Sequence, residues 1–349
     1  MQKKIEKILI VGVTYDFALE QSYARAAQHL GMKVKMFDPI IVSEKYSKFG
    51  FFGKQLQRFL PVEAWDRKVN RELIVTVKEY EPDLIMVFTS TRVLYGSLIT
   101  IKTISKAKMV WIWPDSPLNL NENNYFSRKL FDLSATYSIG SLPYLEHVGF
   151  NNVHWVPLAG DSMLHSIKKE KTALIRDVSF VGMWRPEREK YMKSIIENLG
   201  HLNIEIYGSV WKRDCKDKAV LKKWKGNGIT GKDMAKYFSS SRVNINVIDD
   251  TNFPAANMRF FEICMAGGLQ VTTLAPEMES KFVHKKHLLY SKNESEMLEN
   301  IQWVLKNPDQ ADQIRKDGQE LVENSELYIH RFNYIISELS KINDLIRFK

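Results

Sequence analysis

Apolar and polar positions alternate through the first half of the chain in short blocks that predict strands and helices in turn. An apolar run at 7–13 predicts a strand, helical spacing over 18–30 predicts a helix closed by Gly31, and the run at 34–37 predicts the next strand. Such a strand–helix–strand unit opens a parallel sheet. The rest of this half predicts strands at 83–88, 109–113, 135–138 and 153–156, and helices at 91–104 and 142–147.

The same alternation starts again after a polar, basic stretch at 168–176, which we interpret as a linker. Two successive patterns that meet near Pro157 predict an α/β protein with two Rossmann-like domains facing a cleft. The second half predicts strands at 177–181, 204–207, 242–248 and 269–272, helices opening at 185 and 258, and further helices at 232–238, 294–305, 311–324 and 327–346.

The most informative stretch runs from Asn257 to Gly268, between an aromatic-proline loop at 251–254 and a short strand. Arg259 and Glu262 are three residues apart, so both project from one side of a helix. A helix N-terminus offers free N–H groups and a positive dipole end, and a guanidinium adds a forked cation, so the pair suits a diphosphate next to sugar hydroxyls. An amphipathic helix with a surface Arg–Glu pair has the same spacing.

As a whole, Arg-x-Phe-Glu, four residues and then Gly-Gly before a strand resembles the nucleotide-sugar site of GT-B glycosyltransferases. It is most similar to the CgeB/YkvP-like group, of the glycosyl transferases group 1 type. The resemblance implies that Glu262 binds the ribose of the donor. Many retaining members carry a second glutamate, with seven residues between the two. Pro254 occupies that position here, so neither a sugar-hydroxyl contact nor retaining stereochemistry is implied.

The resemblance also implies the domain roles and the remaining donor-binding residues. Residues 1–157, with a last helix that crosses back from about 328, would form the acceptor-side domain, and 158–327 would bind the donor. Gly182 would approach the phosphates, with Arg185 and Arg188 competing for the basic role. Alternatively, Arg188 is a solvated helix charge. The expected donor set is completed by Gly208 of the Tyr-Gly turn, Asn257 and Arg259.

Two aspartates are candidate catalytic bases or acceptor-binding groups. Asp115 lies between Pro114 and Pro117 after the strand at 109–113, and ligands of open α/β sheets bind beyond the carboxyl ends of strands. Alternatively, Asp115 is a turn aspartate that caps the next segment. Asp16 follows the first strand in the same way.

Composition places the chain among globular proteins, with 349 residues, 44% hydrophobic and 26% charged. The net charge of +9 favours anionic partners, including phosphorylated or membrane-proximal acceptors, although a lysine-rich surface without function is common. Two cysteines form no disulfide framework, and Cys264 lies in an apolar helix where we expect it to be buried. No segment is long enough to span a membrane. We therefore expect a cytoplasmic protein, with peripheral association at the inner membrane surface open.

Neither a metal nor a cofactor is predicted, and the nucleotide sugar would be a co-substrate. Asp-x-Asp is absent, Asp249-Asp250 is interpreted as a turn, and His147, His154 and His165 are interpreted as surface or packing residues. Two basic segments stay open. Aromatic residues interleaved with lysines at 43–71 suit a packed helix, an interfacial helix or an acceptor surface. Seven basic and two acidic residues at 211–225 suggest a solvated insertion or an anionic acceptor surface.

The leading hypothesis is a metal-independent glycosyltransferase that moves a sugar from a nucleotide diphosphate donor to an acceptor. A nucleotide-sugar or glycan binding protein without turnover is the alternative that Pro254 favours. A nucleic-acid-binding protein is a third hypothesis, which rests on charge alone because no nucleic-acid motif is present.

Overall fold

A computed structural model describes residues 4–46, 63–88, 93–167 and 173–347 of the chain. The chain divides into two compact units, Met1–Val156 with Arg331–Lys349, and Pro157–His330. The sequence placed the first boundary one residue later, after 157, and the second three residues earlier, at 328. Each unit is an α/β layer built on one six-stranded parallel sheet.

The first unit has the strand order β2-β1-β3-β4-β5-β6. Its central strands are nearly uninterrupted apolar runs because both faces of a parallel sheet are covered. Ile8, Leu9 and Ile10 of β1 are all fully buried. The strands are β1 Lys7–Val11, β2 Lys33–Phe37, β3 Leu84–Val87, β4 Lys108–Trp113, β5 Leu133–Thr136 and β6 Val153–Trp155.

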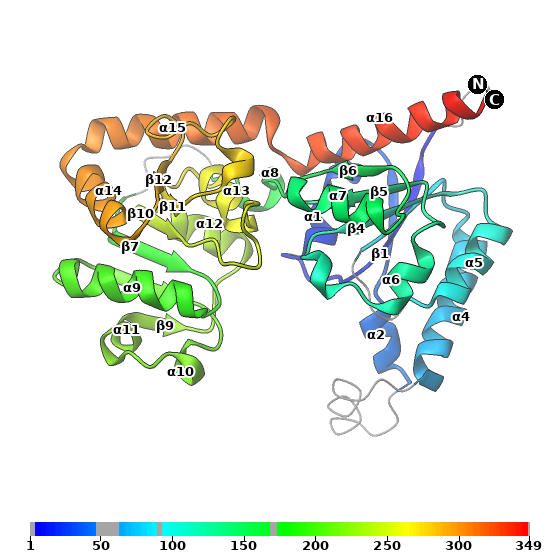
Figure 1. Ribbon diagram of the computed structural model, residues 1–349, viewed down its shortest axis with the longest axis horizontal. Coiled ribbons are helices and arrows are strands. Elements are labelled where there is room, and N and C mark those ends of the chain that lie inside the picture. Colours follow the sequence, from blue (N-terminus) through cyan, green and yellow to red (C-terminus); the bar gives the residue numbers. More distant parts are fainter. Residues whose placement is uncertain (1–3, 47–62, 89–92, 168–172, 348–349) are drawn as a thin grey trace. The chain divides into compact units, whose positions relative to one another are not determined.

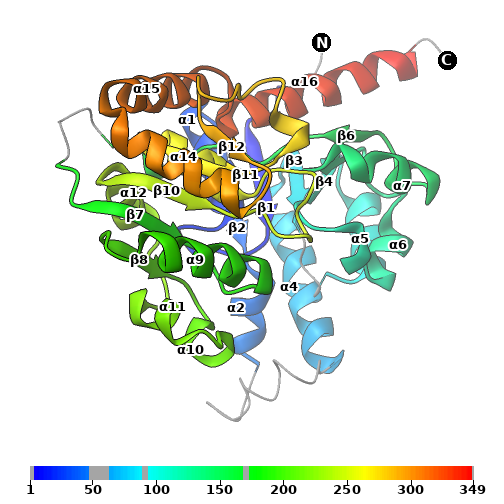
Figure 2. The same ribbon diagram turned by 60° about the vertical axis from the view of Figure 1, so that its left-hand side comes forward.

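Helices cover both faces of this sheet (Figure 1). Leu9, Val11 and Trp111 share one core with α4, α5 and α7, whereas the alternate residues of the same strands point to the opposite face. Figures 1 and 2 show α1 near the start of α16, and the charge of Arg331 in the first turn of α16 acts on Tyr23 of α1. The helices are α1 Leu19–His29, α2 Pro39–Glu44, α4 Glu63–Tyr80, α5 Tyr95–Ile104, α6 Glu122–Ser127, α7 Leu142–His147 and α16 Tyr328–Arg347, which starts in the second unit.

The second unit has the strand order β12-β11-β10-β7-β8-β9. Read from β9, this is the doubly wound order in which the connections change direction between β7 and β10. Ligands of such sheets bind at the carboxyl ends of the strands on either side of that switch point. The strands are β7 Arg176–Val181, β8 Ile204–Tyr207, β9 Trp224–Gly226, β10 Ser241–Asn246, β11 Gln270–Thr273 and β12 Leu289–Ser291.

Alternation along β7 divides the core of this unit between two faces. Val178 and Phe180 pack with α9, α11 and α14, and Val181 packs with α12 and α13. The helices are α8 Ser162–His165, α9 Pro186–Leu199, α10 Trp211–Asp214, α11 Lys218–Lys223, α12 Gly231–Ser239, α13 Met258–Met265, α14 Glu294–Lys306 and α15 Pro308–Ser325.

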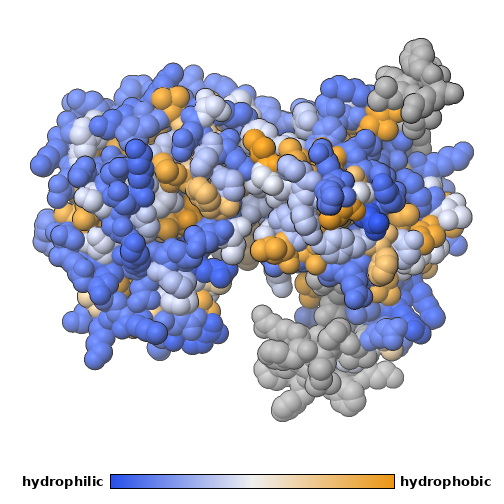
Figure 3. All heavy atoms as spheres, viewed as in Figure 1, coloured by the Kyte–Doolittle hydropathy of each residue, from blue (hydrophilic) through white to orange (hydrophobic). Residues whose placement is uncertain are grey.

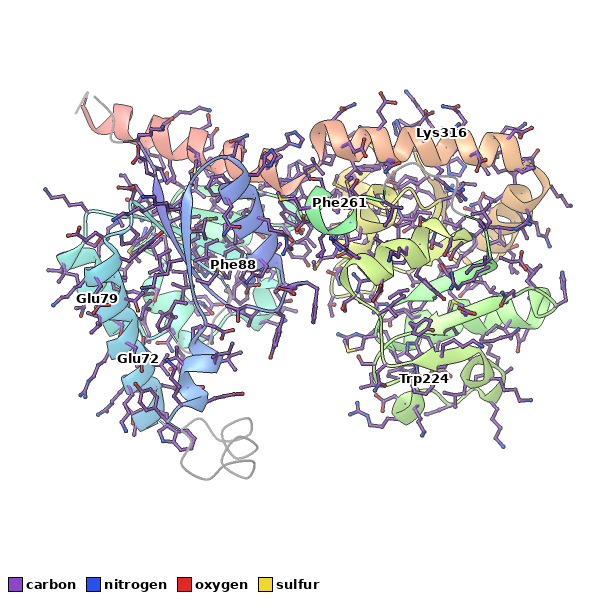
Figure 4. All side chains as sticks on the ribbon, turned by 180° about the vertical axis from the view of Figure 1, so that it is seen from behind. Glu72, Glu79, Phe88, Trp224, Phe261 and Lys316 are labelled. Carbon is purple, nitrogen blue, oxygen red and sulfur yellow. The ribbon has the colours of Figure 1, made fainter. Side chains whose placement is uncertain are left out.

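The predicted order of strands and helices is confirmed for most of the described chain, with ends shifted by one to three residues. Several short elements were not predicted, among them α6, α8, α10, α11 and β9. The prediction of a solvated insertion at 211–225 is wrong, because Trp211 and Val220 are fully buried and β9 completes the sheet. Figure 4 places Trp224 in this part of the unit, beside α10 and α11. The strand β12 was not predicted.

Some predictions fall outside the described residues. Of the basic-aromatic stretch at 43–71, residues 47–62 lie outside them, and the rest belongs to α2, α4 and the turn after α2. The predicted helix at 91–104 begins outside them and is described from Tyr95. Figure 3 shows a largely hydrophilic face on both units, with hydrophobic residues in separate patches.

Candidate functional site

The start of α13 is fixed to the end of β10 by a pair of buried asparagines. Asn257 precedes the helix, and its Oδ1 accepts a hydrogen bond from the Phe260 N–H at 3.1 Å. Asn246, the last residue of β10, exchanges two side-chain hydrogen bonds with Asn257 at 2.9 and 3.1 Å. The Asn257 side chain therefore caps and positions α13. The donor contact predicted for it would have to come from its backbone or from a rearranged side chain.

Arg259 and Glu262 form an ion pair on the first turns of α13, as their spacing predicted. The Arg259 Nη1 donates to the Glu262 Oε2, and the Arg259 Nε donates to the Val181 carbonyl at the end of β7, 3.2 Å away. The Arg259 side chain is 29% exposed and that of Glu262 only 3%. The guanidinium is thus anchored across the β7–β10 switch point while part of it stays open to a ligand.

A buried histidine contacts the other oxygen of the same carboxylate. His165 ends α8, whose start is capped by Asp161, and its Nε2 lies 3.7 Å from the Glu262 Oε1. Its side chain is 4% exposed. Of the three histidines interpreted as surface or packing residues, this one lies at the site. No local pattern could predict the contact, because His165 and Glu262 are far apart in the sequence.

Arg188 and Arg185 have different surroundings at the opening of α9. Arg188 donates to the Asp249 Oδ2 at 2.7 Å, to the Val247 carbonyl at 3.2 Å and to the Met183 carbonyl at 2.9 Å. Burial lowers the pKa of Arg188, and the positive charges of Arg185 and Arg259 act in the same direction. The three guanidiniums are therefore close enough to repel one another, a situation that an anion would relieve.

Arg185 is the guanidinium with the least satisfied hydrogen-bonding capacity in this cluster. It immediately precedes α9, and its buried Nε has no hydrogen-bond partner within the described parts of the chain. An unsatisfied buried donor costs about 1–3 kcal/mol. Of the two arginines that competed for the phosphate role, Arg185 is the one that a bound anion would complete.

Gly182 and Gly208 hold two loops together at very close range. A Cβ on Gly208 would lie 1.7 Å from the Gly182 carbonyl oxygen, so only glycine fits there. The Gly182 N–H donates to the Tyr207 carbonyl and the Gly208 N–H to the Gly226 carbonyl, both at 2.9 Å. Trp211 donates its indole N–H to the Gly182 carbonyl at 2.8 Å. Because both N–H groups are already used, these glycines shape the loop next to Arg185 and offer no free donor.

The loop between β10 and α13 is organised by Asp249. Its Oδ1 accepts hydrogen bonds from the Thr251 hydroxyl at 2.6 Å and the Asn252 amide at 2.8 Å. Burial raises the pKa of Asp249, but these bonds and the charge of Arg188 outweigh it and hold that pKa below its ordinary value. The turn predicted at Asp249-Asp250 is therefore tied to α9. Phe253 in the same loop is 53% exposed.

The two candidate bases of the first unit differ in the hydrogen bonds that their carboxylates accept. The Asp115 Oδ1 accepts a hydrogen bond from the Ser116 N–H at 2.7 Å, and its Oδ2 accepts one from the Asn119 amide at 2.9 Å. Asp16 lies in an exposed turn after β1, and no hydrogen bond to its carboxylate occurs among the described residues. Both follow the carboxyl ends of strands, but within the described part of the chain only the Asp115 carboxylate accepts hydrogen bonds.

Within the described residues, no group of three or more His, Cys, Asp or Glu side chains is arranged to hold a metal ion. No helix of the described chain is both long enough and apolar enough to cross a membrane. Both cysteines are free and buried, as predicted for Cys264.

Comparison with known proteins gives a family match for part of the chain. Residues 185–337 match the family model described as glycosyl transferase-like, a segment that contains Arg185, Arg259 and Glu262. No curated protein is recognisably similar to this chain in sequence.

Solved structures match nearly the whole chain at low sequence identity. A glycosyltransferase from Rickettsia africae has a TM-score of 0.68 at 11% identity, covering 97% of this chain and 98% of its own. Sucrose-phosphate synthase from Thermosynechococcus elongatus has a TM-score of 0.65 at 12% identity, covering 97% and 100%. Anabaena HepE in complex with UDP has a TM-score of 0.61 at 12% identity, covering 97% and 100%. The chain thus has the two-unit architecture of GT-B glycosyltransferase structures, as the sequence predicted.

Proposed function

We propose that this protein is a metal-independent glycosyltransferase that moves a sugar from a nucleoside diphosphate donor to an acceptor hydroxyl. The observation that carries the proposal is the set of side chains at the β7–β10 switch point. Glu262 is held between Arg259 and His165, and Arg185 lies close by with an unsatisfied donor. The Arg-x-Phe-Glu motif is our reason for placing the chain with the CgeB/YkvP-like group.

The donor would bind the second unit through two kinds of contact. Glu262 would accept hydrogen bonds from the ribose hydroxyls, and Arg259 and Arg185 would bind the diphosphate near the N-terminus of α13. Since Anabaena HepE was crystallised with UDP and with UDP-glucose, uridine diphosphate is the first ligand to test.

The reaction would break the bond between the sugar's anomeric carbon and the diphosphate oxygen and form a bond from that carbon to the acceptor oxygen. The diphosphate leaves with the bonding electron pair, and its growing charge is offset by the arginines and the helix N–H groups, so no metal is needed. The acceptor's proton passes to a carboxylate of the first unit. We favour Asp16 of the two candidates because its carboxylate accepts no hydrogen bond from the described residues, whereas Asp115 holds a turn.

A binding protein without turnover is the second candidate function. The loop before α13 favours it, because it presents exposed Phe253 and then Pro254 where many retaining enzymes have a glutamate. Hydrolysis or transfer of a bound nucleotide sugar excludes this candidate, and tight binding without either reaction supports it. Nucleic-acid binding stays a prediction from net charge alone. The two buried, unpaired cysteines fit a reducing compartment, and we therefore keep the cytoplasm as the proposed location.

The proposed function is tested by a thermal-shift screen against nucleoside diphosphates and their sugars. A ligand present at a hundredfold its Kd should stabilise the fold by about 2.7 kcal/mol. No shift with any nucleoside diphosphate, in a protein that unfolds cooperatively, would refute the donor site.

A further inference from the structure

The three arginines of the proposed donor site are not equally paired. Arg188 forms an ion pair with Asp249 at 2.7 Å. Arg259 forms an ion pair with Glu262. Arg185 forms none within the described chain, and its buried Nε has no hydrogen-bond partner there. Its charge nevertheless acts on both Arg188 and Asp249. One guanidinium of the cluster is therefore left without a carboxylate.

A third carboxylate at this site is also unpaired. Glu187 lies in the first turn of α9, two residues after Arg185. Its Oε2 is buried and accepts no hydrogen bond from the described residues. Burial lowers the pKa of Arg188, and the negative charge of Glu187 opposes that shift. Glu187 therefore lies close enough to the arginine cluster for its charge to act there.

The unpaired guanidinium and the unpaired carboxylate do not satisfy each other. Neither a hydrogen bond nor an ion pair joins Arg185 to Glu187 in the described structure, because residues two apart do not face one another on a helix. A buried polar atom without a partner costs free energy and calls for an explanation. A ligand would remove both costs if it accepted a hydrogen bond from the guanidinium and donated one to the carboxylate.

These two requirements restrict the chemistry of the ligand. An ionised phosphate can accept from Arg185, but its charge repels Glu187 and it has no proton to donate. A hydroxyl group can donate to a carboxylate. The ligand should therefore carry a hydroxyl close to a phosphate. In a nucleotide sugar the transferred sugar is joined directly to the terminal phosphate, so its hydroxyls lie a few bonds from that group.

We propose that Glu187 binds a hydroxyl of the transferred sugar, while Arg185 binds the phosphate to which that sugar is attached. The proposal rests on the proposed function, because it takes Glu262 as the ribose ligand. It deepens that function by assigning the residue that contacts the sugar. It also supplies a carboxylate for the sugar in a chain that has Pro254 in the loop before α13.

Two other roles for Glu187 make different predictions. A carboxylate in the first turn of a helix stabilises that helix through its dipole, a role that would affect every ligand alike. Alternatively, Glu187 could hold a divalent cation against the diphosphate, in which case its effect would require that cation. The experiment therefore has to compare ligands with and without the sugar, in the presence and in the absence of Mg²⁺.

The test is calorimetric titration of the full chain with UDP, GDP and ADP, each bare and as its glucose conjugate, in EDTA and then in Mg²⁺. Glu187→Ala should weaken binding of the conjugate about tenfold or more, because a hydrogen bond to a charged group is lost. It should leave the bare nucleotide unchanged or slightly tighter, because a negative charge is removed. Glu187→Gln should show a smaller loss, since its amide oxygen still accepts a hydrogen bond.

Glu197→Ala is the matched control. Glu197 lies on the same helix, its side chain is 58% exposed, and it pairs with Lys193. This variant should bind every ligand as the wild type does.

Three results would overturn the proposal in a variant that unfolds as cooperatively as the wild type. They are an unchanged Kd for the conjugate, an equal loss for conjugate and bare nucleotide, and a loss that appears only with Mg²⁺. If Glu187→Ala does not fold, a wild-type Kd of Glu187→Gln for the conjugate overturns the proposal. A wild type that binds nucleotides without any sugar-specific effect of Glu187 refutes this proposal alone. A wild type that binds no nucleoside diphosphate refutes the proposed function as well.

Discussion

Glu262→Gln is the substitution that tests the donor site most directly. It preserves the size of the side chain and one oxygen, but it removes the charge that Arg259 and His165 face. If the carboxylate binds ribose, the variant should bind UDP more weakly while its affinity for inorganic pyrophosphate, which has no ribose, changes little. The comparison of these two ligands assigns the loss to a part of the nucleotide.

The size of the effect follows from the burial of the carboxylate. The side chain is 3% exposed, so a hydrogen bond that it makes to a ligand competes little with water. A hydrogen bond to a charged group is worth about 1.5–3 kcal/mol, which corresponds to about 10- to 150-fold in Kd. Arg259 is 29% exposed and keeps its bond to the Val181 carbonyl, so it does not become an isolated buried charge in the variant.

Isothermal titration calorimetry with UDP, its 2′,3′-dideoxy analogue and pyrophosphate measures the effect. The dideoxy analogue should bind wild type and variant about equally, because it lacks the hydroxyls that the carboxylate contacts. Glu205→Gln is the matched control. Glu205 forms an ion pair with Arg176 at 2.7 Å in the same unit, on β8, and its side chain is 19% exposed. That variant should bind all three ligands as the wild type does.

Two results would refute the assignment. One is an unchanged UDP affinity in a variant that unfolds as cooperatively as the wild type. The other is an equal loss for UDP and pyrophosphate, which would mean that Glu262 acts by orienting Arg259 and does not contact ribose.

The remaining predictions concern the arginines, the base and acid stability. Arg185→Ala should weaken UDP and pyrophosphate alike at an unchanged Tm, whereas Arg188→Ala should lower the free energy of unfolding by about 3–5 kcal/mol, since it leaves a buried carboxylate unpaired; the opposite pattern in calorimetry and denaturant unfolding would reverse their roles. Asp16→Asn should reduce the rate of sugar transfer by about 10²–10⁴-fold with donor affinity intact, and Asp115→Asn should reduce it less. Wild-type transfer rates in both variants would exclude both aspartates as the base. The depressed pKa of Asp249 means that its stabilisation is present above the ordinary carboxyl pKa and is lost as pH falls through the folded value. The Tm of wild type should therefore fall more steeply below about pH 4 than that of Asp249→Asn.

The sequence was most informative where structure is local. Apolar runs ended by glycine located β1, β7 and β8, because buried parallel strands need continuous apolar residues and a residue that lets the chain turn. The prediction for 211–225 was wrong because the structure there depends on contacts that are distant in the sequence. The segment's seven basic residues dominate the composition, and the burial of Trp211 against Phe180 depends on contacts with a strand far away in sequence.

The candidate site divides in the same way. Arg259 and Glu262 are one helical turn apart, so their pairing could be predicted from spacing. The contact of His165 with Glu262 and the pairing of Arg188 with Asp249 could not be predicted from spacing, because each joins residues that only the folded sheet brings together. The structure explains glycine at 182 and 208 by the close approach of two loops, and both N–H groups are already hydrogen-bonded.

Net charge is a weak guide to the partners of a two-unit protein because it averages over surfaces that act separately. Coulomb interactions between exposed charges are largely screened beyond about 8–10 Å in physiological salt, so a ligand responds to the side chains next to it. At the proposed donor site, Arg188 experiences the charges of both Arg185 and Arg259. This local cluster of three guanidiniums, more than the +9 charge of the whole chain, is the reason to expect a diphosphate there.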